Sequence, residues 1–343
     1  MQSPRVTLRD IASRAGVHLS TVSLALRNHP RIPAETRKRI HAIAEELGYE
    51  PDPMLSALAL YRDRRRPKAF HGTLAWLANS DEGFDWSKSS HYSKYYSGVE
   101  ARAREYGYNV EVFDFAASPE MSPQRMSAIF RARNITGLFL CPHPTGFAGV
   151  DFPWEDFSLI TFGYSMTKLR LHTVASAHYR NARRVLQEVA ERGYRRPGLV
   201  ISGQTDMICD YNISAAYLLE QSLAKVRRRI PPLIDLKEHP GKLKPWLEKY
   251  EVDVIVTTQE YTNLLLEAGL PIPERLGLAN LSLPRKNQLV SGIMEDDEKI
   301  GAVAADLLVA AIHRGERGVP SDPQRTHLEG FWNEGKTLRS RQS

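Results

Sequence analysis

Residues 6–26 read VTLRDIASRAGVHLSTVSLAL, and this stretch predicts two short helices joined by a bend that contains Gly16. Thr7 is placed to cap the first helix, and Asp10 stands where the acid of a capping box stands. Four apolar residues at helical spacing share one buried face of that helix: Leu8, Ile11, Ala12 and Ala15. Two helices in this arrangement let one of them enter a DNA major groove, so the stretch predicts sequence-dependent DNA binding.

The second helix and a third one complete a small core around the bend. The apolar stripe of the second helix consists of Val17, Val22, Ala25 and Leu26. Its other face consists of Leu19, Ser20, Thr21, Ser23 and Leu24. These side chains are short and polar, or apolar enough to contact thymine methyl groups. A third helix is predicted by Ile40, Ile43, Ala44 and Leu47, and Gly48 is placed to end it. The sequence therefore predicts a head of three helices.

The positive charge of the chain gathers in this head. The whole sequence has 46 basic and 40 acidic residues and a net charge of +6. Residues 1–68 hold 13 of the basic and 7 of the acidic residues, so the remainder has 33 of each and is neutral. A basic run such as residues 62–66 fits a solvated linker equally well when it is taken alone. Beside a predicted helix-turn-helix, the basic excess favours contact with DNA phosphates.

The composition of the whole chain is that of an ordinary globular protein. Its 343 residues exceed one typical domain, and 42% are hydrophobic and 25% charged. No apolar run approaches the roughly 18 residues that a membrane span needs. The first residues carry no apolar export segment, and the two cysteines, Cys141 and Cys209, predict no disulfide framework. We expect a cytoplasmic protein without membrane association, in the compartment that holds DNA.

Residues 51–70 predict a hinge helix and linker between the head and the rest of the chain. Pro51 disfavours helix before it, Asp52 can cap, and Pro53 suits the first helical position. A short amphipathic helix is expected to follow, with Met54, Leu55 and Leu58 on its apolar face. Such a helix is too short to be stable alone, so it needs a second subunit, DNA, or both. The alternative is a linker helix that packs on the body of the protein.

From about residue 72, predicted strands alternate with predicted helices. The strands are expected at residues 73–78, 109–115, 137–140, 159–162, 197–202, 252–257 and 276–281, and the helices at residues 95–106, 181–192, 211–225 and 299–313. This alternation predicts an α/β fold with parallel sheets covered on both faces. Two such series in tandem predict two similar lobes with a cleft between them, and ligands of such folds bind beyond the carboxyl ends of the strands.

The head resembles the LacI–GalR family of bacterial transcription regulators, on residues 6–12, 15–17, 21–23, 36–37 and 47–51. The tail resembles the same family on residues 291–293, 298–302, 314–320 and 329–332. The resemblance implies a helix-turn-helix head, a hinge helix and a two-lobed core, similar to periplasmic binding proteins, that dimerises. The expected domains are 1–50, 51–70 and 71–343. The expected lobes are 71–172 with 284–320, and 173–283 with 321–335.

The resemblance also implies which residues contact DNA. The base-reading positions fall on Leu19 and Ser20, with Leu24 one turn later. Because Leu24 stands where many members have arginine, contacts with thymine methyl groups are expected in place of a guanine contact. Leu58 matches the leucine that is wedged into the minor groove, and Leu55 would extend that apolar contact. The remaining expected DNA contacts, each of which could instead be solvent-exposed, are Thr7, Leu8, His18, Thr21, Ser23, Arg27, Thr36 and Tyr49.

The resemblance implies a small-molecule effector in the cleft, but the sequence departs from the family at the positions expected to hold sugars. Residues 174–179 lack the usual aspartate–asparagine pair, and no arginine stands near residues 211–213. A common sugar is therefore disfavoured. Side chains at strand ends that could line the cleft, or could equally be surface or core, are Asp81, Trp86, His91, Tyr92, Tyr164, His178, Asp206 and Glu260.

Signatures of catalysis are missing from the sequence. It has no Gly-x-Gly-x-x-Gly, phosphate loop or Gly-x-Ser-x-Gly elbow, and its 11 histidines lack metal-site spacing. No enzyme activity, cofactor or metal is expected. The sequence favours a homodimeric repressor that binds a near-palindromic operator and is modulated by a small molecule. The alternative is a DNA-binding regulator whose core only dimerises and senses nothing.

Overall fold

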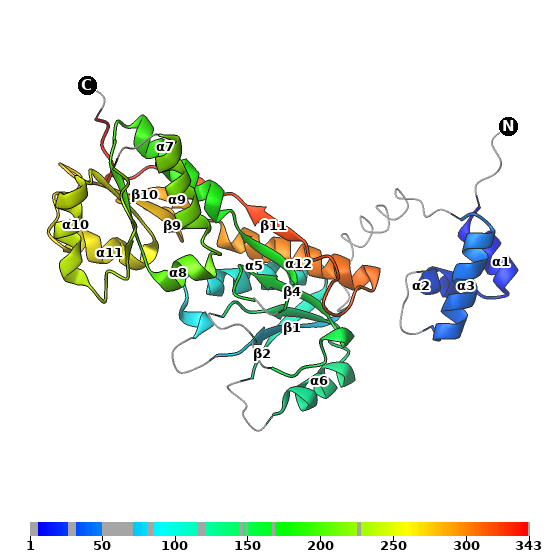
Figure 1. The fold of residues 1–343 in the computed structure, drawn as a ribbon. Helices are drawn as coiled ribbons and strands as arrows, with labels where there is room; N and C mark the ends of the chain where they lie inside the picture. Colours follow the sequence, from blue (N-terminus) through cyan, green and yellow to red (C-terminus); the bar gives the residue numbers. More distant parts are fainter. Residues whose placement is uncertain are drawn as a thin grey trace, which may run out of the picture.

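The computed structural model describes residues 6–26, 32–49, 71–80, 85–115, 121–143, 147, 150–166, 169–224 and 228–341. Figure 1 shows a small helical head and two α/β lobes. The predicted hinge at residues 51–70, with Leu55 and Leu58, lies outside the described residues, as do Arg27 and Asp81. Within the described part of the chain, no helix is both long and apolar enough to span a bilayer.

The head consists of the three predicted helices, α1 (Leu8–Ala15), α2 (Leu19–Leu26) and α3 (Ala34–Glu46). Gly16 ends α1 in the left-handed conformation, with φ 63° and ψ 33°, which a residue with a side chain rarely adopts. The Asp10 carboxylate accepts hydrogen bonds from the backbone nitrogen and the hydroxyl of Thr7, both at 2.7 Å. The buried core of the head consists of Ile11, Ala15, Val22, Ala25, Ile40 and Ala44. Its apolar spacing was therefore sufficient to predict the packing.

The first lobe is built on a six-stranded parallel sheet with the order β11-β5-β4-β3-β1-β2. Its strands are β1 (Gly72–Ala78), β2 (Tyr108–Asp114), β3 (Gly137–Leu140), β4 (Ser158–Phe162), β5 (His172–Ser176) and β11 (Arg325–Leu328). Its helices are α5 (Tyr92–Glu105), α6 (Pro123–Ala132) and α12 (Asp297–Arg314), with short 3-10 turns η1 (Trp86–Lys88) and η2 (Trp154–Asp156). Successive residues of β1 point to opposite faces, so Trp76 packs with α5 and α12 while Leu77 packs with α6.

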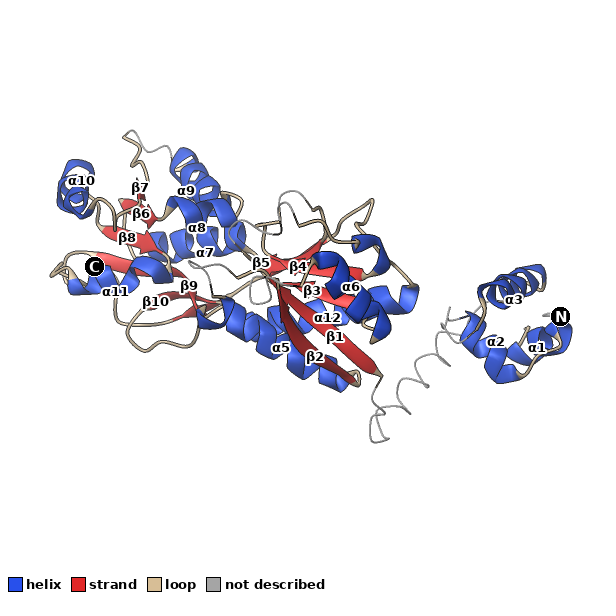
Figure 2. Ribbon diagram, turned by 90° about the horizontal axis from the view of Figure 1, so that it is seen from below, coloured by secondary structure: helices blue, strands red, loops and turns tan. Residues whose placement is uncertain are grey.

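The second lobe is built on a six-stranded sheet with the order β12-β10-β9-β8-β6-β7, in which only β12 is antiparallel to its neighbour. Its strands are β6 (Pro197–Ile201), β7 (Leu233–Ile234), β8 (Val254–Thr257), β9 (Gly277–Leu283), β10 (Ser291–Met294) and β12 (Phe331–Asn333). Its helices are α7 (His178–Glu191), α8 (Gly203–Ile208), α9 (Asn212–Leu223), α10 (Leu243–Tyr250) and α11 (Gln259–Glu267), with η3 (Pro240–Lys242). Helices α7 and α9 cover one face, and α10 and α11 cover the other (Figure 2).

Three segments carry the chain between the lobes, and we call them the crossovers. The first joins β5 to α7, the second joins β10 to α12, and the third joins β11 to β12. These crossovers shift the expected lobe boundaries, because β5 and β11 extend the first sheet while β10 belongs to the second. The expected cut at 283/284 placed β10 in the wrong lobe, since a four-residue strand shows too few alternations to predict its sheet.

Both cysteines of the chain are buried thiols, one in each lobe. Cys141 is 2% exposed and Cys209 is 7% exposed. Burial raises the pKa of both thiols, because a thiolate loses its hydration in an apolar environment. We expect neither thiol of the native protein to react within minutes with a chromogenic disulfide reagent, and both to react in guanidinium chloride. Immediate release of one equivalent by the native protein would contradict this burial.

Candidate functional site

The exposed end of α2 is the first candidate site. Val22 and Ala25 are fully buried in the head, so the opposite side of α2 is turned outward. Leu19 is 38% exposed and Ser20 is also exposed. Thr21, Ser23 and Leu24 are half-buried beside them. The first turn of α2 therefore presents an apolar and a hydroxyl side chain to its surroundings.

His18 fixes the first turn of this helix. The backbone nitrogen of Ser20 donates a hydrogen bond to His18 Nδ1 at 3.3 Å, and the Ser20 hydroxyl lies 2.8 Å from the same nitrogen. The imidazole thus satisfies one of the backbone donors that a helix start leaves unpaired. The His18 residue itself is exposed.

The other residues predicted to contact DNA lie elsewhere on the head. Thr7 is exposed and bonded to Asp10, and Thr36 is half-buried in the first turn of α3. Leu8 and Tyr49 pack partly against the head core, where burial of apolar surface alone accounts for them. The DNA-contact roles of these residues remain predictions.

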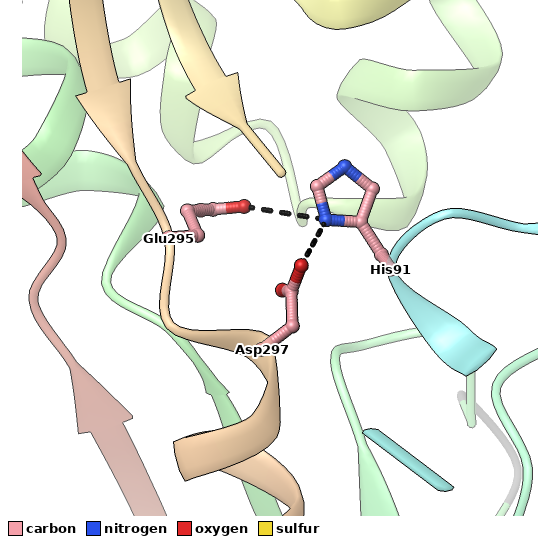
Figure 3. Close-up of side chains that lie close together, drawn as sticks. All are labelled: His91, Glu295 and Asp297. Atoms are coloured by element: carbon pink, nitrogen blue, oxygen red, sulfur yellow. Dashed lines mark hydrogen bonds and ion pairs between the residues drawn. The ribbon is translucent and has the colours of Figure 1, made fainter. Parts of the chain in front are cut away.

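The second candidate site is a cluster of buried acids and histidines at the junction of the lobes. His91 precedes α5, Glu295 lies on the second crossover, and Asp297 is the first residue of α12. His91 Nδ1 lies 3.0 Å from Asp297 Oδ2 and 3.8 Å from Glu295 Oε2 (Figure 3). The side chains of Asp297 and Glu295 are 0% and 4% exposed, whereas that of His91 is 24% exposed. We call these three residues the junction triad.

Asn181 joins all three crossovers around the triad. Its Nδ2 donates to Ser176 Oγ at 3.0 Å and approaches Glu295 Oε1 at 3.4 Å. Its Oδ1 accepts from the backbone nitrogen of Gly330 on the third crossover at 3.0 Å. Ser176 Oγ in turn donates to Glu295 Oε1. This network fixes one oxygen of Glu295 and leaves the other facing His91.

The protonation of the triad is set by burial and by its mutual charges. Burial lowers the pKa of His91, but its hydrogen bond to Asp297 and the charges of Asp297 and Glu295 outweigh that effect and raise the pKa. Burial raises the pKa of Glu295, against the stabilising effect of His91. A carboxylate pair in this environment therefore favours a positive neighbour.

His178 and Tyr164 lie beside the triad. His178 Nδ1 is 3.8 Å from Glu295 Oε1, and its ring centroid is 6.3 Å from that of Tyr164. Burial, together with the neighbouring His91 and His327, lowers the pKa of His178 to about 4. The Tyr164 hydroxyl lies 2.8 Å from His327 Nε2. The structure thus brings together three of the residues predicted to line the cleft.

The remaining predicted effector residues pack within their own lobes. The ring centroid of Trp86 lies 5.3 Å from those of Trp76 and Tyr96, and Tyr92 packs against the same core. Asp206 is buried and accepts from the Ser214 backbone nitrogen at 3.3 Å. Glu260 pairs within the second lobe with Ser202 Oγ at 2.7 Å, Thr205 Oγ1 at 3.1 Å and Lys237 Nζ at 3.2 Å. These partners account for Asp206 and Glu260 without a ligand, and their effector roles remain predictions.

Sequence reasoning missed Ser176, Asn181, Glu295 and Asp297. Asp297 is adjacent to Asp296 in the sequence, and adjacent residues of a helix point apart, so this pair does not indicate a shared site. Its actual partner His91 is 206 positions away in the sequence, so no local spacing reveals the pair. One signal in the sequence could have indicated the site: polar residues follow β5 and β10, and binding sites lie beyond the carboxyl ends of parallel strands.

The structure therefore combines a three-helix head, which contains a helix-turn-helix, with a core of two α/β lobes joined by three crossovers. Residues 7–52 match the family model of bacterial regulatory proteins, lacI family. The chain is 33% identical over 138 residues to the HTH-type transcriptional regulator PtxS of Pseudomonas plecoglossicida, covering 40% of this chain and 36% of PtxS. It is 24% identical over 213 residues to the repressor CytR of Escherichia coli K12, which covers 62% of this chain and 58% of CytR. The helix-turn-helix head of this chain, residues 7–52, therefore belongs to the lacI family of bacterial regulatory proteins.

The similar curated sequences are matched only in part, whereas similar solved structures are matched over nearly their whole length. The chain spans about a third of PtxS and just under three fifths of CytR. The structure of the regulator CelR with cellobiose has a TM-score of 0.58 at 18% identity, covering 97% of this chain and 100% of that one. The lac repressor dimer on its operator has a TM-score of 0.55 at 16% identity, covering 97% and 99%. At these identities the likeness concerns the fold.

Proposed function

We propose that this chain is a sequence-specific DNA-binding transcriptional regulator, and in particular a repressor that binds a near-palindromic operator as a homodimer. The observation that carries the proposal is the outward first turn of α2, where Leu19 and Ser20 are exposed on a helix held by a buried core. The net +6 charge within residues 1–68 supports it, because phosphate contacts supply most of the affinity for DNA. Two heads of a two-fold dimer match the two halves of such a site.

A small molecule in the cleft between the lobes is the second part of the proposal. Ligand closure of two lobes changes the geometry of the crossovers and hence the placement of the heads. Two of the residues predicted for the cleft, His91 and His178, lie at the crossovers, which supports this coupling. A common sugar remains disfavoured, and regulation of transcription rather than catalysis is the proposed activity.

Selective retention of DNA by the full-length chain tests the proposed function. We expect fragments of one sequence class to be retained from a genomic library. Their affinity is expected to fall by about 1000-fold between about 50 and 200 mM salt, as for a protein that makes about six or more phosphate contacts. Light scattering is expected to give twice the chain mass. Retention of all fragments alike, or a monomer that stays monomeric on duplex DNA, would contradict the proposal.

The rival interpretation is a core that only dimerises. The pairing of Glu260 with Ser202, Thr205 and Lys237 favours it, because these groups already satisfy one another. A thermal-shift screen of metabolites separates the two interpretations, because a ligand that binds only the folded state raises the unfolding midpoint. A reproducible rise with one compound excludes the scaffold, and a screen without any rise favours it.

A further inference from the structure

We propose that the junction triad of His91, Glu295 and Asp297 binds one divalent transition-metal ion of the Zn²⁺ type. The proposal does not depend on DNA binding by the head. Each residue offers one ligand atom, and the three atoms lie within 4.8 Å of one another. Imidazole nitrogen and carboxylate oxygen are both ligands that Zn²⁺ accepts.

The separations between the ligand atoms suit a single ion. Bonds of about 2.0–2.2 Å in tetrahedral geometry place neighbouring ligand atoms about 3.3–3.6 Å apart. The distances from His91 Nδ1, 3.0 Å to Asp297 Oδ2 and 3.8 Å to Glu295 Oε2, lie on either side of that range. Two of the three separations are therefore close to those around a single ion, and the third is no longer than 4.8 Å. The 24% exposed His91 side chain leaves a route for the ion and a position for water.

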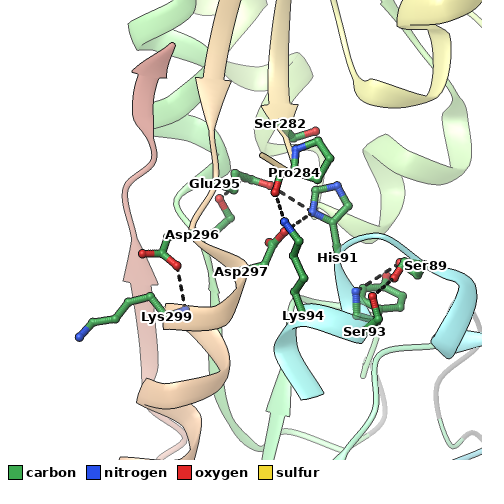
Figure 4. Close-up of polar contacts among 12 residues, drawn as sticks. Ser89, His91, Ser93, Lys94, Ser282, Pro284, Glu295, Asp296, Asp297 and Lys299 are labelled. Atoms are coloured by element: carbon green, nitrogen blue, oxygen red, sulfur yellow. Dashed lines mark hydrogen bonds and ion pairs between the residues drawn. The ribbon is translucent and has the colours of Figure 1, made fainter. Parts of the chain in front are cut away.

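Among the described residues, only histidines pair with the two carboxylates of the triad. Among the described residues, neither carboxylate forms an ion pair with lysine or arginine. The nearby Lys94 ammonium donates to the Pro284 carbonyl oxygen instead (Figure 4). The Asp297 side chain is 0% exposed, and its Oδ1 atom has no hydrogen-bond partner in the described part of the chain. A buried carboxylate oxygen without a partner costs free energy that a bound ion would recover.

The surrounding structure already orients the ligands. Ser176 and Asn181 hold Glu295 Oε1, so the other oxygen faces His91. Asp296 caps α12 by accepting from the Lys299 backbone nitrogen at 3.0 Å (Figure 4). That cap leaves the adjacent Asp297 carboxylate directed at His91 (Figure 3). Hydrogen-bonded support of this kind is what holds metal ligands in place in known sites.

Calorimetric titration of the untagged, chelator-dialysed full chain with ZnCl₂ tests the site. We expect one ion per chain, and MgCl₂ in excess should not displace it because magnesium prefers an all-oxygen octahedral set. His91→Ala, Glu295→Gln and Asp297→Asn are each expected to weaken zinc binding at least about 100-fold. His239→Ala, which removes an exposed imidazole outside the triad, should leave the affinity unchanged. Circular dichroism verifies that each variant is folded.

Cobalt absorption keeps the proposal testable if a variant fails to fold. Wild-type protein loaded with one equivalent of Co²⁺ is expected to show visible bands of a four- or five-coordinate ion, and Zn²⁺ should abolish them. The proposal is overturned if the wild type binds no zinc. It is equally overturned if the folded triad variants bind zinc as tightly as the wild type, or if Co²⁺ shows only the spectrum of the hydrated ion. Neither experiment contains DNA, so failure here leaves the proposed regulator function standing.

Discussion

Replacing Ser20 by glutamate is expected to lower the affinity of the protein for its selected DNA site about 100-fold or more. Ser20 lies exposed in the first turn of α2, the part of the helix that faces a groove in the proposed complex. A carboxylate there meets phosphates and base acceptors of the same sign, and it replaces a hydroxyl that can donate. Glutamate in the first turn of a helix is favourable to the helix itself, so the head should stay folded.

Fluorescence anisotropy on a fragment retained from the library measures this loss. The matched control is Ser13→Glu, which makes the same change of charge at an exposed position of α1. We expect the control to weaken binding only slightly and uniformly across sequences, as a distant charge does in salt. Equal losses for the two variants would mean that α2 has no special place at the DNA, and would refute the proposed recognition surface.

The head could be predicted from the sequence because its structure is local. The apolar residues of α1 to α3 recur at helical spacing, and Gly16 separates the first two helices where the structure bends. The capping contact of Asp10 with Thr7 was also predicted, since it spans three residues. Such features depend on neighbours in the chain, so they need no knowledge of the tertiary fold.

The core could be predicted only as an alternation of strands and helices. The long elements were confirmed, including β1, α7 and α12, whose apolar residues are numerous enough to show a period. The strands β5, β7, β10, β11 and β12 were missed, and all but β5 have only two to four residues, which are too few to show a period. The junction triad was missed for another reason. It forms where the second crossover meets the start of α5, and that meeting depends on the order of strands in two sheets.

The close crossing of α5 and α12 is a further non-local feature. Gly98 of α5 packs against the backbone of Glu298, and Gly301 of α12 packs against the backbone of Tyr95. A Cβ atom at Gly301 would overlap the Tyr95 carbonyl oxygen and lie 2.9 Å from the Val99 nitrogen. The two helices can therefore approach this closely only because each carries a glycine at the contact. The same crossing positions Asp297 and His91, which lie at the first turns of these helices.

Gly301→Ala is accordingly expected to destabilise the protein by about 3 kcal/mol or more, the upper end for overpacking, because backbone cannot move aside as a flexible side chain can. Urea unfolding followed by tryptophan fluorescence measures the change. The matched control is Gly241→Ala, where an added Cβ meets nothing within 4 Å. That control should change stability by no more than about 0.5 kcal/mol, since it adds no contact and reduces the entropy of the unfolded chain. If Gly301→Ala were as stable as Gly241→Ala, α5 and α12 would not be in backbone contact, and the arrangement that joins the lobes around the junction triad would be wrong.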